Sequence, residues 1–170
     1  MHPVSLNCFS SPIQRVTTWN DLFLKTELVQ AALKLGYQFP SPIQIMGIPK
    51  IMQGHHLICQ SKAGSGKTAV FAMGILHNLR PEVDGSFLPH QCIVIAKTRE
   101  LAYQIAGDFN KLSSMMNFPK VRIGCFFGGT QVIKDIDQLT NSAKSPHIIV
   151  GTPGRLADLI EKGLINTRVV

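Results

Sequence analysis

A short glycine-rich segment between an apolar run and a predicted helix restricts the possible folds of this chain most. It reads Cys59-Gln60-Ser61-Lys62-Ala63-Gly64-Ser65-Gly66-Lys67-Thr68. The run before it, Leu57-Ile58-Cys59, predicts a short buried strand, and residues 68–79 predict a helix. A helix that begins at a glycine-rich turn presents free backbone N–H groups and the positive end of its dipole to one point. This arrangement suits a nucleoside triphosphate, whose phosphates Lys67 would contact while the Thr68 hydroxyl binds Mg²⁺.

Composition indicates one basic globular domain. The chain has 170 residues, of which 45% are hydrophobic and 16% charged, enough for a sizeable core. The net charge of +7 favours a polyanionic partner such as nucleic acid, although a soluble basic protein without one can carry the same charge. The four cysteines form no C-x-x-C pair, so we expect no zinc site. Cys59, Cys92 and Cys125 lie in apolar runs, as buried thiols do, so we expect a reducing compartment. We also expect no membrane span and no secretory signal, because long apolar runs are missing.

The sequence alternates between predicted helices and predicted strands. Residues 1–18 are predicted to be a loosely ordered arm, and residues 19–170 a single domain. The expected helices span 21–35, 42–53, 68–79, 99–115, 130–141 and 153–162, and the expected strands 57–59, 92–96, 121–127, 147–150 and, at its beginning, 168–170. Strands that alternate with helices predict an α/β fold with a mostly parallel sheet flanked by helices.

The glycine-rich segment departs from the strict pattern G-x-x-x-x-G-K-[ST], because Ser61 stands at its first position. It resembles instead the A-x-x-G-x-G-K-T loop of DEAD-box ATP-dependent RNA helicases. Four further segments match that family in order and rough spacing between Trp19 and Asp158, nearly the whole chain. The resemblance implies a RecA-like P-loop domain that binds ATP and Mg²⁺, with Lys67 and Thr68 as catalytic residues. The phosphate-binding residues would be Ser61, Ala63, Gly64, Ser65, Gly66, Lys67 and Thr68.

The segment Gly36-Tyr37-Gln38-Phe39-Pro40-Ser41-Pro42-Ile43-Gln44 looks like the family's Q motif, which selects adenine. The Gln44 amide offers one donor and one acceptor, which match the N7 acceptor and N6 donor of adenine. The resemblance implies that Tyr37 stacks on the base and that Trp19 is the family's isolated upstream aromatic residue. Taken alone, the segment is also explained by a helix capping box that Gln44 completes and by a Tyr37 that packs in the core.

Three segments resemble motifs that contact the RNA backbone in this family. Residues 97–104 are similar to motif Ia, 126–129 to the G-G turn and 152–155 to motif Ib, although Lys97 replaces the usual proline. The RNA-binding residues implied are Thr98, Arg99, Gly128, Gly129, Thr152, Pro153, Gly154 and Arg155. Asp158, one turn later, could accept a hydrogen bond from a ribose 2′-OH. Local alternatives stay open, namely a plain helix cap at Thr98, an ordinary glycine turn and a solvated Asp158.

Finer likeness points to the subfamily that works in nuclear mRNA splicing and export. It lies in residues 58–62, 66–71 and 146–151 and in the missing proline at Lys97. The likeness implies single-stranded RNA as a partner with little sequence preference, proteins of the mRNA-export complex as further partners, no membrane association and a nuclear location. Family resemblance without the subfamily would leave a cytoplasmic location.

The family's motif II, Asp-Glu-x-Asp, does not occur in the 170 residues. In the family it ends a strand whose beginning Arg168-Val169-Val170 resembles, so we expect a domain truncated before that strand, the S-A-T motif and the second RecA-like domain. The expected sheet then has exposed apolar edges, which favour aggregation. Two alternatives are a truncated, non-catalytic module that binds RNA or a protein partner, and an unrelated P-loop NTPase.

We expect purified residues 1–170 not to hydrolyse ATP at a useful rate, because the carboxylates that assist Mg²⁺ and orient the attacking water are absent from this sequence. A phosphate-release assay with and without single-stranded RNA measures this. Turnover that RNA stimulates would contradict the expectation.

Overall fold

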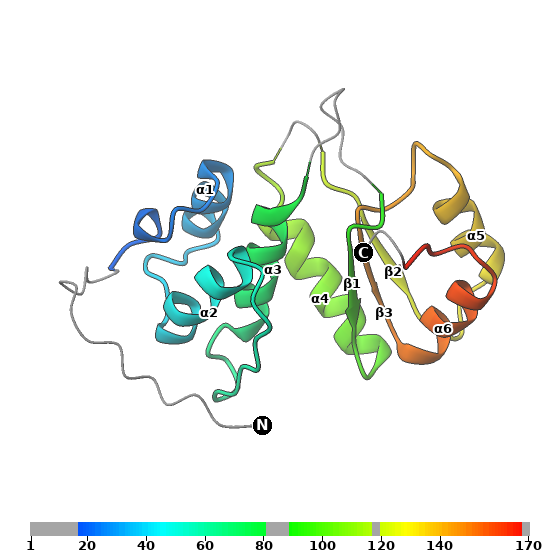
Figure 1. Ribbon diagram of the computed structural model, residues 1–170, viewed down its shortest axis with the longest axis horizontal. Coiled ribbons are helices and arrows are strands. Elements are labelled where there is room, and N and C mark those ends of the chain that lie inside the picture. Colours follow the sequence, from blue (N-terminus) through cyan, green and yellow to red (C-terminus); the bar gives the residue numbers. More distant parts are fainter. Residues whose placement is uncertain (1–16, 81–88, 117–119, 168–170) are drawn as a thin grey trace.

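In the described part of the chain, the fold is a three-stranded parallel sheet with helices on both faces, as expected for an α/β domain (Figure 1). The computed structural model describes residues 17–80, 89–116 and 120–167. Its helices are η1 Asn20–Leu22, α1 Thr26–Lys34, α2 Pro42–Met52, α3 Lys67–Asn78, α4 Arg99–Leu112, α5 Val132–Thr140 and α6 Pro153–Glu161. Its strands are β1 Cys92–Ile95, β2 Ile123–Phe126 and β3 Ile148–Gly151. Helices α1, α2 and α3 lie on one side of the molecule, and α5 and α6 lie on the other (Figure 1).

Strand β3 lies in the middle of the sheet, in the order β1-β3-β2. All four of its residues are buried, as is usual for a parallel strand covered on both faces. The register pairs Gly151 with Ile95 on one side and with Phe126 on the other. All three strands therefore end at the same edge, and the segments that follow them begin side by side.

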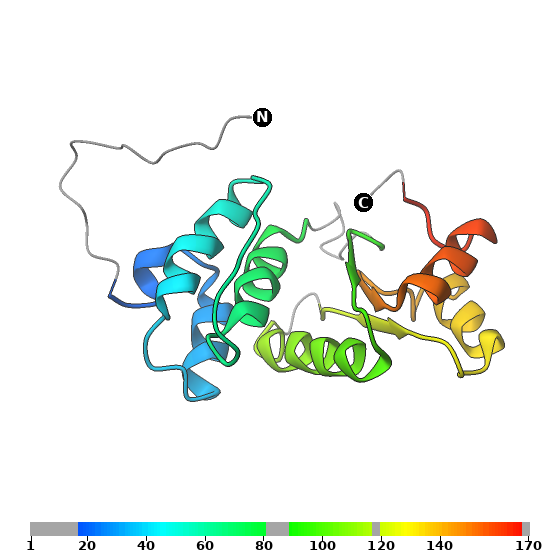
Figure 2. The ribbon, with the colours of Figure 1, turned by 90° about the horizontal axis from the view of Figure 1, so that it is seen from below.

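Alternate residues of β3 pack into two cores, because successive side chains of a strand point to opposite faces. Ile148 and Val150 belong to the larger core, which lies against α4 and extends through α1 and α3. Ile149 belongs to the smaller core under α5 and α6. Figure 2 shows α4 along one face of the strands and α5 and α6 on the opposite side.

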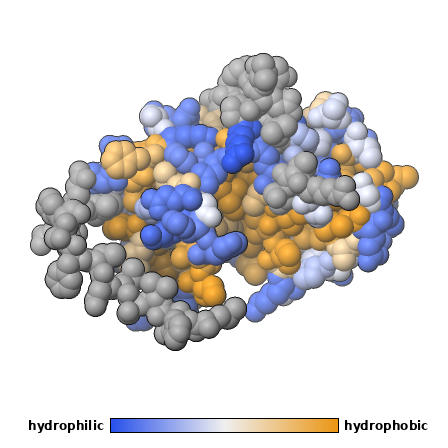
Figure 3. Space-filling view, viewed as in Figure 1, coloured by the Kyte–Doolittle hydropathy of each residue, from blue (hydrophilic) through white to orange (hydrophobic). Residues whose placement is uncertain are grey.

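The prediction of a strand at Leu57-Ile58-Cys59 is wrong. Residues 55–61 form no helix or strand, Ile58 is 99% exposed and Cys59 is exposed rather than buried. A strand requires a hydrogen-bonded neighbour, and β1 pairs only with β3 within the described part of the chain, so the apolar run has no strand beside it. Ile95 of β1 is also 66% exposed. Figure 3 shows hydrophobic residues gathered over the middle of this face of the molecule.

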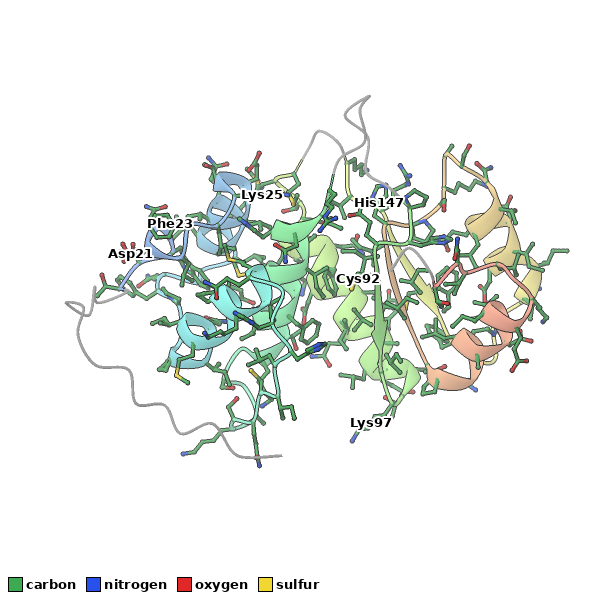
Figure 4. All side chains as sticks on the ribbon, in the orientation of Figure 1. Asp21, Phe23, Lys25, Cys92, Lys97 and His147 are labelled. Carbon is green, nitrogen blue, oxygen red and sulfur yellow. The ribbon has the colours of Figure 1, made fainter. Side chains whose placement is uncertain are left out.

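The helix expected over residues 21–35 is interrupted. Phe23 has φ of 55°, a left-handed conformation that ends η1, and its side chain is 78% exposed (Figure 4). The Asp21 carboxylate accepts hydrogen bonds from the N–H groups of Thr17 and Thr18, which stabilises this separate turn. The other expected helices agree with the structure to within about three residues at each end, a normal uncertainty for boundaries. The strand beginning at 168–170 and residues 1–16 of the arm lie outside the described residues.

His147, directly before β3, is fully buried (Figure 4). Its Nδ1 accepts a hydrogen bond from the N–H of Arg122 at 2.9 Å. Burial, and secondly the positive charge of Arg122, lower the pKa of His147 to about 4. Burial also lowers the pKa of the nearby His90, whose Nε2 lies 3.2 Å from the Ser145 hydroxyl.

His147 should make the free energy of unfolding depend on pH. Because the folded protein binds this proton less tightly than the unfolded chain, stability falls as pH drops from about 6.5 to about 4, by up to about 3 kcal/mol. In His147→Asn the side-chain oxygen can accept from Arg122 N–H without titrating, so the pH dependence should flatten. Urea unfolding of both proteins at pH 7, 6, 5 and 4 measures the slope. Equal slopes in the two proteins would contradict the assignment to His147.

Candidate nucleotide pocket and nucleic-acid groove

Helix α3 begins directly after the glycine-rich loop. Gly66 precedes it with φ of 88°, in the left-handed region that favours glycine. No side chain caps the first turn of α3, and that turn contains no acidic residue. The Lys67 ammonium donates to the carbonyl oxygens of Ser61 and Lys62, at 2.6 and 2.7 Å, and so closes the loop. The start of α3 is therefore compatible with an anionic ligand.

The beginning of α2 holds this loop by hydrogen bonds. Ser41 Oγ donates to the carbonyl of Ser65 at 2.9 Å, and Gln44 Nε2 donates to that of Gly66 at 3.4 Å. Gln44 Oε1 accepts the N–H of Ser41 at 2.7 Å, completing a capping box. A Cβ at Gly66 would lie 2.4 Å from Gln44 Nε2, so the contact requires glycine there. The capping box expected as an alternative for Gln44 is present, and Gln44 lines the pocket as well.

A pocket of about 960 Å³ brings together most of the predicted nucleotide-binding residues. Tyr37, Gln44 and residues 63–69 line it on the side of α2 and α3. Helix α4 lines it with Leu101, Gln104, Asp108, Lys111 and Leu112. Tyr37 is 45% exposed rather than packed in the core, which leaves its ring accessible to a ligand.

Trp19 and Ser61, which the motifs also indicated, lie behind the residues that line the pocket. Trp19 is 2% exposed, and its indole N–H donates to the carbonyl of Tyr37 at 2.6 Å. The Ser61 hydroxyl lies 2.5 Å from the Ser65 hydroxyl across the loop. Both side chains support lining residues and do not line the pocket themselves.

The polar face of α4 was not recognised from the sequence as part of the nucleotide pocket. Gln104, Asp108 and Lys111 follow one another at helical spacing and all line the nucleotide pocket. The spacing alone could have shown that they share a face. Which face points to the loop depends on how α4 packs against α3.

A second depression, of about 830 Å³, lies at the edge where the strands end. The predicted RNA-binding residues that line it are Thr98, Arg99, Gly128, Thr152, Gly154, Arg155 and Asp158. Gly129 and Pro153 do not line it. Gly129 has φ of 91°, and a Cβ there would lie 2.6 Å from Nη1 of Arg99, so the Arg99 guanidinium lies close over the glycine turn.

Thr98 caps α4, because its hydroxyl accepts the N–H of Leu101 at 3.2 Å. The local alternative of a helix cap is therefore present at a residue that also lines the groove. Asp158 forms an ion pair of 2.7 Å with Lys162, the residue directly after α6, and both side chains are partly exposed.

Arg155 is engaged in an internal ion pair. Its side chain is buried and its Nη1 donates to the carboxylate of Asp135, which is buried as well. It also donates to the hydroxyl and the carbonyl oxygen of Thr130, at 3.3 and 3.0 Å. Arg155 thus ties the start of α6 to α5 and to the turn before α5. Asp135 was missed in the sequence, because a carboxylate in a first helical turn resembles an ordinary solvated acid.

The described residues contain no group of three His, Cys, Asp or Glu side chains arranged for a metal ion. Thr68, the residue predicted to bind Mg²⁺, lines the nucleotide pocket, and Mg²⁺ usually binds few protein ligands and retains water. Among the described helices, none is both long and apolar enough to cross a bilayer.

Asp135→Ala should destabilise the fold by about 3–5 kcal/mol, because it leaves the buried Arg155 charge without its partner. Asp137→Ala on the same helix is the matched control. It removes an exposed pair with Lys144, so a loss of about 0–1 kcal/mol is expected. Urea unfolding of both variants gives the comparison, and equal losses would contradict a structural role for the buried pair.

Comparison with known proteins identifies the family. The model of the DEAD/DEAH box helicase family matches residues 41–170. The ATP-dependent RNA helicase SUB2 of Phaeosphaeria nodorum is 42% identical over 146 residues, which are 85% of this chain and 32% of that protein. The Aspergillus fumigatus protein of the same name is 40% identical over 156 residues, which are 91% of this chain and 33% of that one. The chain thus spans about a third of the length of these relatives.

Solved structures agree with this likeness. A DEAD box protein from the hyperthermophile Methanococcus jannaschii matches with a TM-score of 0.76 at 30% identity, over 91% of this chain and 39% of that one. Saccharomyces cerevisiae Dbp5 bound to RNA and ADP-BeF3 matches with a TM-score of 0.72 at 28% identity, over 89% of this chain and 36% of that one. The RecA-like fold and the family resemblance inferred from the motifs are confirmed. The chain belongs to the DEAD/DEAH box helicase family.

Proposed function

We propose that this chain forms the ATP-binding part, and one portion of the RNA-binding surface, of an ATP-dependent RNA helicase. The observation that carries the proposal is that most of the motif residues gather in two neighbouring hollows, a nucleotide pocket and a groove at the strand ends, with α4 in the wall of both. The relatives named as ATP-dependent RNA helicases and the neighbour bound to RNA and ADP-BeF3 support the same reading.

ATP would bind with its phosphates at the start of α3. An ammonium has three donors, and Lys67 uses two of them on carbonyl oxygens of its own loop, so one remains for a phosphate oxygen. Thr68 would present its hydroxyl to Mg²⁺, which shields phosphate charge when bound. Gln44 and Tyr37 are our candidates for recognition of the adenine base, since both line the pocket.

RNA would lie along the groove at the strand ends. Two helices, α4 and α6, begin there, and their N-terminal N–H groups together with Arg99 suit phosphates. Arg155 acts in this proposal through its ion pair with Asp135, which holds α6 in position. Contacts to the backbone rather than to base edges favour binding with little sequence preference.

We further propose a role in nuclear mRNA splicing or export. The support is the likeness of residues 58–62, 66–71 and 146–151 to the subfamily that works there, together with the SUB2 relatives. This implies a nuclear location and proteins of the mRNA-export complex as partners. The binding of Mg²⁺ and the roles of the individual site residues are likewise part of our proposal that the chain belongs to an RNA helicase.

The test is equilibrium binding of ATP and GTP to the protein. ATP should bind more tightly than GTP, and Lys67→Ala should weaken ATP binding by about 10- to 100-fold, the effect of losing a hydrogen bond to a charged group. Lys50→Ala, on the exposed part of α2 outside the pocket, is the control. Unchanged ATP binding in Lys67→Ala would refute the phosphate site.

Gln44→Glu tests the adenine assignment separately. The variant keeps an oxygen that can accept the Ser41 N–H and loses the amide donor. Its added charge should weaken both nucleotides, so the ratio of ATP to GTP affinity is the measured quantity. We expect that ratio to fall towards one, whereas an unchanged ratio would show that Gln44 does not read the base.

A further inference from the structure

The nucleotide pocket and the groove share one residue. Of the described residues that line either hollow, Lys97 alone lines both. It follows β1 and the buried Ala96, and it precedes Thr98, which caps α4. Lys97 therefore stands at the turn that separates the two hollows.

The side chain of Lys97 is available for ligands. It is exposed and extends away from the turn between β1 and α4 (Figure 4). Three other cations at these hollows have internal partners: Lys67 bonds its own loop, Arg155 pairs with Asp135, and Lys162 pairs with Asp158. Arg99 lines only the groove, and Lys111 lines only the nucleotide pocket. Within the described part of the chain, no hydrogen bond or ion pair engages the Lys97 ammonium.

The two hollows lie on opposite sides of this turn. The glycine-rich loop and α3 lie on one side of the turn between β1 and α4, and α6 lies on the other (Figures 1 and 2). Figure 4 shows Lys97 at this turn. A lysine carries one compact charge on a flexible stem. It can turn to an anion on either side, and an ammonium bound on one side is withdrawn from the other.

We propose that Lys97 is shared between the nucleotide and the RNA and binds a phosphate of one ligand at a time. The inference rests on the proposed function, which supplies two anionic ligands, and it deepens that function by naming a regulatory residue. In each binary complex Lys97 contacts the ligand that is present. In the ternary complex it contacts only one, so it makes the two ligands antagonise each other.

The sharing has a defined thermodynamic signature. Replacing Lys97 removes one phosphate contact from each binary complex but only one from the ternary complex. The substitution therefore weakens the binding of either ligand to the free protein more than it weakens the binding of that ligand to the complex with the other. The coupling factor, defined as the Kd of the nucleotide without RNA divided by its Kd with saturating RNA, therefore rises when the lysine is lost.

The experiment measures this coupling factor with the non-hydrolysable nucleotide AMP-PNP and a twelve-residue oligouridylate, by fluorescence titration of the protein. In Lys97→Gln the factor should rise about 2- to 5-fold relative to wild type, the range of an exposed ion pair. Lys97→Arg keeps the charge and should retain the wild-type factor. Circular dichroism confirms that each variant is folded.

Two matched variants serve as controls. Lys111→Gln removes a cation that lines only the nucleotide pocket, and Lys162→Gln one that lines only the groove. Either can weaken one ligand, but the same contact is lost with and without the other ligand, so their coupling factors should stay at the wild-type value.

Three outcomes would overturn the inference. A coupling factor in Lys97→Gln that matches the two controls would show that Lys97 is not shared, and a lower factor would show that it assists both ligands at once. Both outcomes leave the proposed function intact. If wild-type protein bound neither AMP-PNP nor RNA, the proposed function would fail and the inference with it.

Discussion

Parallel pairing of β1 and β2 to the central strand β3 is the constraint on which the groove depends. The register aligns the last residues of the three strands, Ile95, Gly151 and Phe126, at one edge. Three segments that are far apart in the sequence then leave the sheet together. Two of them begin helices at that edge, and the third makes the glycine turn under Arg99. Hydrogen bonding in the sheet thus assembles the groove, for which we propose phosphate binding, from otherwise ordinary helix starts.

The nucleotide pocket is assembled by a different kind of interaction. Here the beginning of α2 bonds directly to the glycine-rich loop through Ser41 and Gln44, and α2 packs extensively on α3. The loop is held from its helix side although residues 55–61 before it form no strand. Gly66 permits both the left-handed turn and the close approach of Gln44. The conformation of the glycine-rich loop therefore depends on a few hydrogen bonds that side chains donate to its backbone carbonyls.

Charge is distributed unequally over the two hollows. Buried Arg155 and Asp135 neutralise each other and act as a structural link, and exposed Asp158 and Lys162 form a pair of small energetic weight. The residues that follow β1, Lys97 and Arg99, carry positive charge that no carboxylate neutralises among the described ion pairs. The same residues separate the groove from the nucleotide pocket, which brings the two ligands of the proposed helicase to one turn of the chain.

The sequence by itself determined the α/β fold, the family and the positions of most helices, because these follow from local periodicity, helix caps and motif spacing. It also indicated Gln44, Lys67 and Arg99 as site residues, since their chemistry is written in short contiguous motifs. Only the tertiary structure decided that Leu57-Ile58-Cys59 forms no strand, because strand formation depends on a neighbour elsewhere in the chain. It likewise decided that Asp135 pairs with Arg155 and that Lys97 borders both hollows. These are contacts between distant segments, and no local pattern encodes the packing that brings them together.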